Sequence, residues 1–356
     1  MVEPAFAFAR DTPGFKVLVG GRELPTEAAL DIIDVKVCDY VEGASMFTVR
    51  FNIWDSHRQE LQWIDDARLS EGQEVEVRIG FVDHFGTLII GEITALEPEF
   101  HQNEAPTLVM HGYEHLHRFR RGRKTRSFIN AKDSEIAEQI ARDLKLRARV
   151  DDTQVIHDYV LQNNQTDIDF LLERARRIRY EVIVRDKILH FRKAANATGE
   201  VVSLEYGFTL QSFYPRLNTM RQVSEVVVQG WDPKTKEPIV GEAKLGDEVS
   251  NMHGSQLGAA ITEQAFFTTQ SVIVNTPVFS DTEATQIAKG KFNDMIIDFI
   301  TGEGTAIGNT DIRAGRVIEL LKLGRRFSGL YYVTSSTHSV DQSGYITKFT
   351  VARNAT

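Results

Sequence analysis

Hydrophobic residues recur at every second position over much of the stretch from Gly14 to Tyr113. The apolar positions of the two clearest runs are Phe47, Val49, Phe51 and Ile53, and Val75, Val77 and Ile79. A period of two is typical of antiparallel strands with one buried face. Turn residues separate such runs at Gly20-Gly21, at Glu42-Gly43 and from Asp83 to Gly86. Many short strands separated by turns predict a sandwich or a barrel.

After Phe119 the period changes to that of amphipathic helices. Asp133 is placed to cap one helix, and Thr166 with Asp169 resembles a capping box that opens a second. The two apolar stripes are Ile136, Ala137, Ile140, Ala141 and Leu144, and Ile168, Leu171, Leu172, Ala175 and Ile178. A hairpin around Asp186-Lys187 joins Val182–Val184 to Ile188–Phe191. This segment therefore predicts a small α/β unit.

Strands return after Val201. Ser280 with Glu283 predicts the start of one more helix, and Gly302 is placed to end it. The predicted strands of this part include Val226–Val228, Val317–Lys322, Gly329–Ser335 and Tyr345–Val351. The stretch from Thr235 to Phe279 is weakly patterned and predicts no defined fold.

Two stretches of the chain resemble each other. The segments that begin at Gly72, Gly91 and Thr107 are similar to those that begin at Gly315, Gly329 and Thr347, as in Gly72-Gln-Glu-Val-Glu-Val against Gly315-Arg-Val-Ile-Glu-Leu. Chance similarity between two β meanders and duplication of a β domain, interrupted by the α/β insert, both explain the match.

Composition places the chain among ordinary folded proteins. Of its 356 residues 42% are hydrophobic, and 41 Lys and Arg against 50 Asp and Glu give a formal charge of −9. This charge argues against a dedicated, sequence-specific nucleic-acid binder. Cys38 stands alone, which excludes an intrachain disulfide and suits a reducing cytoplasm. Met1 to Arg10 lacks the pattern of an export signal and no run predicts a membrane span, so we expect synthesis in the cytoplasm without a signal peptide.

The sequence carries no strong catalytic motif. It contains no G-x-S-x-G elbow, H-E-x-x-H, phosphate-binding loop or C-x-x-C. Gly302-Glu-Gly304 with Gly308 has the wrong spacing for a dinucleotide loop, and we interpret it as a helix stop followed by a loop. No pair of carboxylates stands out among the acidic residues. We expect no enzyme activity and no cofactor.

Three histidines form a candidate metal site. His111, His115 and His117 would share one face if the strand continued through them, and their imidazoles would then point the same way. Solvated or core-lining histidines at a strand end are the alternative interpretation, and the sequence offers no further ligand.

A basic block follows these histidines. Its members are Arg118, Arg120, Arg121, Arg123, Lys124 and Arg126. Such a block can bind phosphate, the carboxylates of a neighbouring subunit, or water. The cluster from Arg174 to Arg179 lies in the same predicted unit, so both clusters are candidates for contact with an acidic partner surface.

Three segments resemble the phage late control gene D family of tail hub proteins, which are related to the amino-terminal part of VgrG spikes. They are Gly112-Tyr-Glu-His-Leu-His-Arg with the basic run after it, Gln162-Asn-Asn-Gln-Thr-Asp-Ile-Asp-Phe-Leu-Leu with Tyr180-Glu-Val, and Gly329-Leu-Tyr-Tyr-Val with His338, Gly344-Tyr-Ile-Thr-Lys-Phe and Arg353-Asn354. Their order covers nearly the whole chain. The stretch from Thr235 to Phe279 carries no signature of this kind.

The resemblance implies an α+β, mainly β fold with two related antiparallel β-barrel domains and an α/β insertion between them. Residues 1–118 would form the first barrel, 119–195 the insertion, and 196–356 the second barrel with a loop and helix excursion at about 235–302. It also implies a homotrimer that acts as a symmetry adapter in the baseplate of a contractile phage tail or injection system. Six similar barrels would dock on a sixfold tube and present threefold symmetry to a spike.

The resemblance further implies the partners: a tail tube or tube-initiator protein, other baseplate proteins and a spike with an OB-fold and a β-helix. Because the chain stops at Thr356, we expect that spike to be a separate protein. The candidate interface residues are Arg118, Arg120, Arg121, Arg123, Lys124, Arg126, Arg174, Arg177 and Arg353, and we expect the carboxy-terminal end to approach the spike.

Two other classes remain as alternatives. A receptor- or carbohydrate-binding tail protein would cluster exposed aromatic residues, whereas Trp54, Trp63 and Trp231 are scattered along the chain. A cell-wall hydrolase component would need a nucleophile or a paired carboxylate. The sequence leaves open whether the particle passes DNA or protein.

Overall fold

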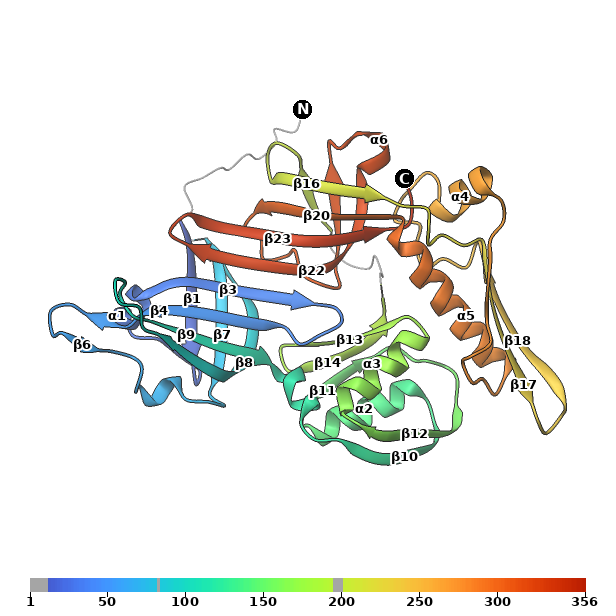
Figure 1. Cartoon of the computed structure of the whole chain (residues 1–356), viewed down its shortest axis with the longest axis horizontal. Coiled ribbons are helices and arrows are strands. Elements are labelled where there is room, and N and C mark those ends of the chain that lie inside the picture. Colours follow the sequence, from blue (N-terminus) through green and yellow to red (C-terminus); the bar gives the residue numbers. More distant parts are fainter. Residues whose placement is uncertain (1–11, 82–83, 195–200) are drawn as a thin grey trace.

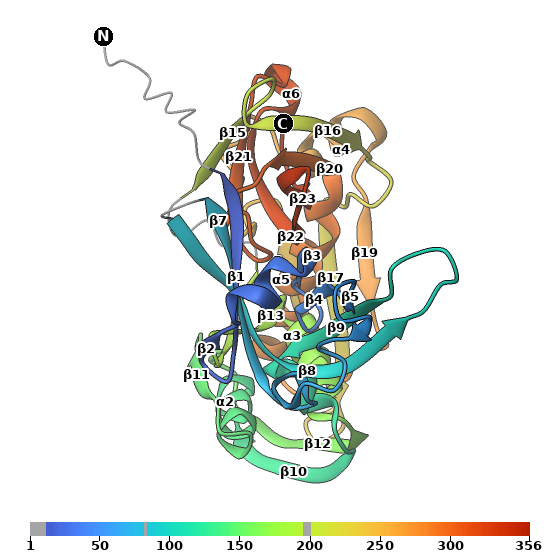
Figure 2. The same cartoon turned by 90° about the vertical axis from the view of Figure 1, so that its left-hand side faces the viewer.

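The computed structural model describes residues 12–81, 84–194 and 201–356. Two stacked groups of strands, an α/β unit below them and a helix with a long hairpin at one side make up the molecule (Figure 1). Figure 2 shows the pair β10 and β12 at the end of the molecule opposite α6. The predictions for Met1 to Arg10, for the start of the turn at Asp83 and for a boundary between 195 and 196 lie outside the described residues.

Six strands form the first half-sheet. They are β1 (Pro13–Val19), β3 (Ile32–Tyr40), β4 (Met46–Asn52), β7 (Glu74–Phe81), β8 (His84–Glu99) and β9 (Thr107–Glu114). The alternation at Phe47 to Ile53 and at Val75 to Ile79 is confirmed, because every apolar position named there is fully buried. These side chains fill one hydrophobic cluster, and the intervening polar residues face outward.

Six more strands form the second half-sheet. They are β15 (Val202–Glu205), β16 (Leu210–Leu217), β20 (Ile300–Ile307), β21 (Val317–Leu321), β22 (Gly329–Asp341) and β23 (Gly344–Arg353). The strands predicted from Val317 to Val351 are confirmed. Antiparallel pairing of β22 with β3 joins both half-sheets into one sheet of 13 strands, which includes β2.

Neither half-sheet closes into the predicted barrel among the described strands. Closure of the first would require β1 to pair with β3, but the free edge of β3 is occupied by β22. The strands therefore run as one open path from β16 to β2. The broader prediction, a mainly β fold of antiparallel strands with an α/β insertion, is confirmed.

The two half-sheets share one pairing order. Along the first, the strands lie in the order β1-β7-β8-β9-β4-β3, and along the second in the order β15-β21-β22-β23-β20-β16. Both orders are the same when strands are ranked by their position in the chain. The single difference is that β1 and β7 are antiparallel, whereas β15 and β21 are parallel.

Irregularities recur at matched positions as well. The ladder between the second and third strands shifts register between Ile32 and Asp34 in the first half-sheet, and between Leu210 and Ser212 in the second. The ladder between the fifth and sixth strands shifts between Ile93 and Ala95, and likewise between Val333 and Ser335. Bulges bend a strand locally, so repeated bulges give both half-sheets the same bends.

Matched glycines precede the fourth strand of each half-sheet. Gly72 and Gly315 have φ values of +82° and +77°, and their N–H groups donate to the carbonyls of Ile93 and Val333 over 2.8 and 2.9 Å. The sequence similarity that begins at these glycines is thus in the structural register. The other two segments are offset: the ladders align Gly91 with Tyr331 and Thr107 with Ile346.

The α/β insertion follows the first half-sheet in the chain. It contains β10 (Lys124–Ala131), α2 (Asp133–Asp143), β11 (Arg147–Val150), β12 (His157–Gln165), α3 (Asp167–Arg177), β13 (Tyr180–Arg185) and β14 (Ile188–Lys193). Thr166 caps α3 by accepting from the Asp169 N–H over 3.2 Å. The predicted cap of α2 is wrong by one residue, since Lys132 is the N-cap and the Asp133 side chain is buried against Arg174.

The weakly patterned stretch forms regular structure. It contributes β18 (Glu237–Lys244), α4 (Gly258–Phe266) and β19 (Gln270–Ile273), and β17 (Glu225–Asp232) pairs with both strands. The long helix α5 (Asp281–Ile296) begins at Ser280, as predicted, and packs on β17 and β18. Figure 1 shows this hairpin and α5 at one side of the molecule.

Gly302 does not end that helix. α5 gives way at Ile296 to the short 3-10 helix η3 (Ile297–Phe299), and Gly302 and Gly304 lie inside β20, so the predicted helix stop and loop is wrong. A Cβ atom would lie 2.6 Å from the Phe213 ring at Gly302 and 2.4 Å from the Phe349 ring at Gly304. Neighbouring aromatic rings therefore require glycine at both positions.

The remaining elements are short. They are β2 (Arg22–Glu23), α1 (Thr26–Leu30), β5 (Trp54–Asp55), β6 (Glu60–Leu61), η1 (Ala67–Leu69), η2 (His115–Arg120) and α6 (Gly324–Phe327).

Candidate functional site

The three histidines do not converge on a metal. The strand that was predicted to carry them ends at Glu114, whose carboxylate accepts the Leu116 N–H over 2.9 Å and so starts η2. Because the backbone turns there, each imidazole contacts a different carboxylate. The N–O distances are 3.1 Å for His111 to Glu97, 4.0 Å for His115 to Glu74 and 2.7 Å for His117 to Glu92. Within 12–81, 84–194 and 201–356 no three such side chains are grouped to hold a metal ion.

The basic block divides into engaged and open side chains. Lys124 and Arg126 both bind the buried carboxylate of Asp167, over 2.6 and 2.8 Å. The Arg123 guanidinium donates to the Asn164 carbonyl over 2.8 Å. The side chains of Arg120 and Arg121 are exposed, and no ion pair involves them in the described part of the chain.

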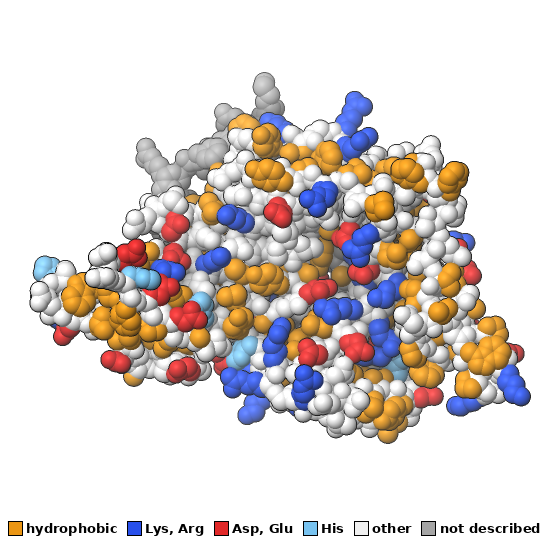
Figure 3. All heavy atoms as spheres, in the orientation of Figure 1, with side chains coloured by type: hydrophobic (Ala, Val, Ile, Leu, Met, Phe, Trp, Pro, Cys, Tyr) orange, Lys and Arg blue, Asp and Glu red, His pale blue; other side chains and the backbone are white. Residues whose placement is uncertain are grey.

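Arg118 and Glu92 form a further ion pair of this region. The guanidinium Nε of Arg118 lies 2.8 Å from a Glu92 oxygen, which His117 contacts as well. Burial raises the pKa of Glu92, but the hydrogen bonds from Arg118 and His117 more than offset this effect and hold the pKa at about 2. This pair joins β8 of the first half-sheet to η2. Lys and Arg side chains gather near the lower middle of Figure 3, where the insertion meets the first half-sheet.

The other predicted interface arginines lie inside the chain. Arg174 is buried against Asp133, with an N–O distance of 2.5 Å, and Arg177 contacts Glu283 over 3.0 Å. Arg353 is 2% exposed, donates to the Ser328 carbonyl over 2.6 Å and lies over the Tyr331 ring. Arg174 thus joins α3 to α2 within the insertion, Arg177 joins α3 to α5, and Arg353 joins the last strand to β22.

A buried ion pair lies where the two half-sheets meet. The Arg313 guanidinium contacts the Asp39 carboxylate and donates to the Leu88 carbonyl over 2.6 Å. Burial raises the pKa of Asp39, but the charge and hydrogen bond of Arg313 outweigh it and leave the pKa below its usual range. The fixed charges thus tie the second half-sheet to β3 and β8 of the first.

His338 occupies the same joint. Its Nε2 lies 3.0 Å from the Ile312 carbonyl, and its Nδ1 lies 2.8 Å from the Tyr345 hydroxyl. Burial, together with the charge of Arg313, lowers the pKa of His338 to about 4. A neutral ring with the proton on Nε2 satisfies both neighbours, since Nε2 donates to the carbonyl and Nδ1 accepts from the hydroxyl.

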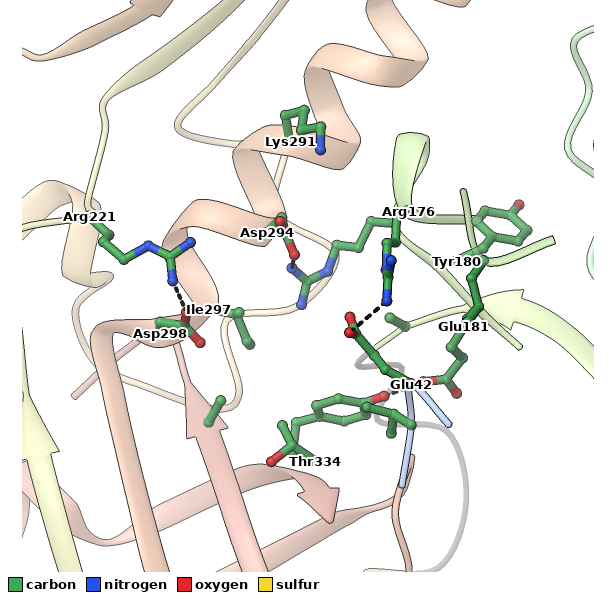
Figure 4. A pocket seen from close by; sticks show the side chains of 16 residues that line it. Glu42, Arg176, Tyr180, Glu181, Arg221, Lys291, Asp294, Ile297, Asp298 and Thr334 are labelled. Atoms are coloured by element: carbon green, nitrogen blue, oxygen red, sulfur yellow. Dashed lines mark hydrogen bonds and ion pairs between the residues drawn. The ribbon is translucent and has the colours of Figure 1, made fainter. Parts of the chain in front are cut away.

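A cleft of about 370 Å³ opens between the insertion, α5 and the loop from β3 to β4 (Figure 4). Ion pairs span it: Arg176 with Glu42 over 3.0 Å, and Arg221 with Asp298 over 2.9 Å. The carboxylates and cations in its wall are balanced, and the described residues group no nucleophile with a base there. Charged and polar side chains therefore form much of the wall of this cleft.

One face of the sheet is polar along eight neighbouring strands, from β16 through β20, β23, β22, β3, β4 and β9 to β8. We call this face the polar band, and it carries both positively and negatively charged residues. Its exposed or half-exposed charged residues include Asp34, Lys36, Arg50, Glu97, Glu99, Arg216, Glu303 and Lys348. Antiparallel sheets commonly bury one face and solvate the other, and here the solvated face spans both half-sheets.

Among the residues that the structure describes, the three tryptophans do not form a cluster typical of sugar binding. Trp63 donates its ring N–H to Asp31 over 2.8 Å and is half-buried, while Trp54 lies in β5 and Trp231 in the hairpin of β17. None of the helices in the described ranges is long and apolar enough to cross a membrane.

Solved tail proteins share this fold over nearly their whole length. The chain is similar to the 43 kDa tail protein of prophage MuSo2 from Shewanella oneidensis, with a TM-score of 0.72 and 14% identity over 96% of this chain and 98% of that chain. A tail protein from Neisseria meningitidis MC58 matches with a TM-score of 0.67 and 13% identity, and 96% of each chain is covered.

A bacterial secretion protein has a related fold. The E. coli c3393 protein, described as a component of the type VI secretion system with structural similarity to the T4 bacteriophage tail proteins gp27 and gp5, matches with a TM-score of 0.55 and 10% identity. The match covers 96% of this chain and 77% of that chain. The fold is thus one that tail proteins use, and the resemblance to tail proteins seen in the sequence is confirmed at the level of the fold.

A family assignment follows from the sequence as well. Residues 9–342 match the family model described as the Alg8 N-terminal domain, and the chain belongs to this family. No curated protein matches the chain.

The joint between the half-sheets was missed from the sequence. Asp39, Arg313 and His338 come from distant segments, and only the strand pairing brings them together. The sequence did carry a signal of the repeat, which begins at Gly72 and Gly315, but this signal does not indicate which strand edges of the two halves meet.

Proposed function

We propose that the chain is the structural hub of a baseplate in a contractile tail or injection system. Two observations support this role: the fold of tail proteins, and the pairing order that repeats in the two half-sheets. The repeat carries the proposal. It fits a duplicated β domain, with residues 1–118 and 196–356 as its two copies and 119–195 as the insertion.

The repeat gives a hub its symmetry. One chain with two similar half-sheets offers two similar docking surfaces, so a trimer offers six. Such a trimer joins a sixfold tail tube, or its initiator protein, to a threefold spike with an OB-fold and a β-helix. This adapter role is typical of the gene D and VgrG-like hubs that the sequence resembles. The chain would be made in the cytoplasm and built into the particle.

The polar band fits the wall of a central channel. Its mixed charges and hydroxyl side chains would stay hydrated while the opposite apolar face fills the core. A wall without a dominant charge suits either DNA or protein as the cargo.

The hub acts through binding in this proposal and carries out no chemistry. Of the candidate interface residues, Arg120, Arg121 and Arg123 lie on the surface and suit an acidic partner, whereas Arg174, Arg177 and Arg353 stabilise the chain itself. The carboxy-terminal end, where the Thr356 N–H donates to the Gln256 carbonyl over 2.9 Å, is proposed to lie toward the spike.

The mass of the purified chain in solution tests the proposal. We expect a trimer, alone or with spike protein present, and co-purification with tube protein from assembled particles. A monomer under both conditions, or turnover of peptidoglycan by the purified chain, would favour the hydrolase or receptor-binding alternatives instead.

A further inference from the structure

The joint pairs the second strand of one half-sheet with the fifth strand of the other. β3, the second strand of the first half-sheet, pairs with β22, the fifth strand of the second, from Tyr40 opposite Ser335 to Val35 opposite Val340. Their counterparts by rank are β16 and the end of β8. In the described part of the chain, neither strand pairs with anything along the matching edge.

Burial differs sharply between the joint and these open edges. At the joint, Val37 and His338 are 0% exposed and Val340 is 3% exposed. The matched bulges align Val340 with Phe100 and Val37 with Pro215. Phe100 is 60% exposed, and Pro215 is exposed as well. Each open edge therefore resembles one strand of the internal joint whose partner strand is missing.

We propose that β8 of one copy pairs antiparallel with β16 of the next copy and repeats the internal joint between chains. This inference rests on the proposed hub function, and it names the surface that assembles the ring. Contacts of this head-to-tail kind use two different surfaces of each chain, so they close a ring when the rotation between copies fits.

The internal register fixes the register between chains. The matched bulges align β3 with β16 and β22 with β8, so each residue pair of the internal joint corresponds to one pair between chains. The six interchain pairs are Ala95 with Asn218, Leu96 with Leu217, Glu97 with Arg216, Pro98 with Pro215, Glu99 with Tyr214, and Phe100 with Phe213.

The paired side chains are complementary on both faces. On the core side, Leu96 meets Leu217 and Phe100 meets Phe213, so apolar surface is removed from water. On the polar side, Glu97 meets Arg216, which has no ion pair in the described part of the chain. A shift of the register by one residue would place Leu96 and Phe100 opposite residues of the polar face of β16.

The backbone supports the same assignment. Asn218 donates its N–H to the Phe299 carbonyl over 2.9 Å, toward β20, so the alternate residues Leu217 and Pro215 direct their backbone outward. Proline lacks an N–H and occurs at open edges of sheets. Pro98 and Pro215 weaken pairing along either edge, and the proposed register places their two missing donors opposite each other, so that one hydrogen-bonded pair is lost rather than two.

Cysteine cross-linking tests this register on the full chain. In a Cys38→Ser background, the double variant Glu97→Cys, Arg216→Cys should form interchain disulfides on mild oxidation and give covalent dimers and trimers on a denaturing gel, since opposite Cβ atoms lie about 5 Å apart. The matched control, Glu97→Cys with Ser212→Cys, places the second thiol on the same face four residues away and should give at least about tenfold less product.

Charge reversal provides a second test with a separate readout. Glu97→Arg should raise the dissociation constant of the trimer about tenfold by placing two cations together, and adding Arg216→Glu should restore it. A trimeric mass with equal cross-linking in both cysteine variants, and no rescue by the double reversal, overturns the strand pairing and leaves the hub function standing. A chain that remains monomeric with and without spike, and forms no cross-link, overturns both.

Discussion

Single residues at the joint hold it together through charge and hydrogen bonding. Asp39 and Arg313 lie 274 positions apart in the chain, and each is almost wholly removed from water. A buried ion pair stabilises little relative to apolar residues, but loss of one partner leaves an uncompensated charge. Removing one of the two charges therefore measures how strongly the stability of the joint depends on this ion pair.

Replacing Asp39 with Ala should lower the free energy of unfolding by about 3 kcal/mol, because Arg313 then stays buried without a counter-charge. Chemical denaturation measures the change. The double variant Asp39→Ala, Arg313→Met should recover part of the loss. If the single variant is as stable as the wild type, the pair does not stabilise the joint.

His338 should make the chain sensitive to acid. Its pKa is about 4 in the native state and about 6.5 when unfolded, so the unfolded chain binds the extra proton between these values. The contribution of His338 is fully present above pH 6.5, falls by about 3 kcal/mol as the pH drops to about 4, and changes no further below that.

The variant His338→Gln isolates this effect, because carboxylates and His190, whose pKa burial also lowers to about 4, titrate alike in both proteins. Stability of wild type and variant measured from pH 7 to pH 4 should converge as the pH falls. A constant difference across that range would show that His338 does not titrate on unfolding.

At the scale of elements, local sequence predicted most of the fold. Strands with alternating residues and helices with capping residues formed where expected, as at Val75 to Ile79 and at Thr166. The misassignments arose where distant contacts decide. Local propensity predicts a helix stop at Gly302, but the neighbouring Phe213 ring requires glycine at this position of the strand. Likewise, Asp133 faces Arg174 and leaves the capping position to Lys132.

Gly304 tests this interpretation of the glycines in β20. A Cβ atom there would lie 2.4 Å from the buried Phe349 ring, so Gly304→Val should lower the free energy of unfolding by about 2 kcal/mol despite the better strand propensity of valine. The adjacent change Thr305→Val, on the opposite face, should alter it by less than about 0.5 kcal/mol. Equal stability of both variants would contradict the requirement for glycine.

For the whole molecule, the basic block connects fold and assembly. Sequence could find these residues but could not sort them, because Lys124, Arg126 and Arg174 have carboxylate partners that only the folded chain brings near. What remains on the surface is a smaller set centred on Arg120 and Arg121. A surface cation that has no partner within its own chain is available to a neighbouring one.

Neutralising Arg120, Arg121 and Arg123 together to Gln should therefore weaken assembly without unfolding the chain, because their side chains are exposed. We expect about tenfold fewer complete particles and an unchanged melting temperature. The matched control neutralises three exposed arginines elsewhere, Arg22, Arg142 and Arg147, and changes the net charge equally. Equal particle yields for the two triple variants would show that total charge, and not this surface, governs assembly.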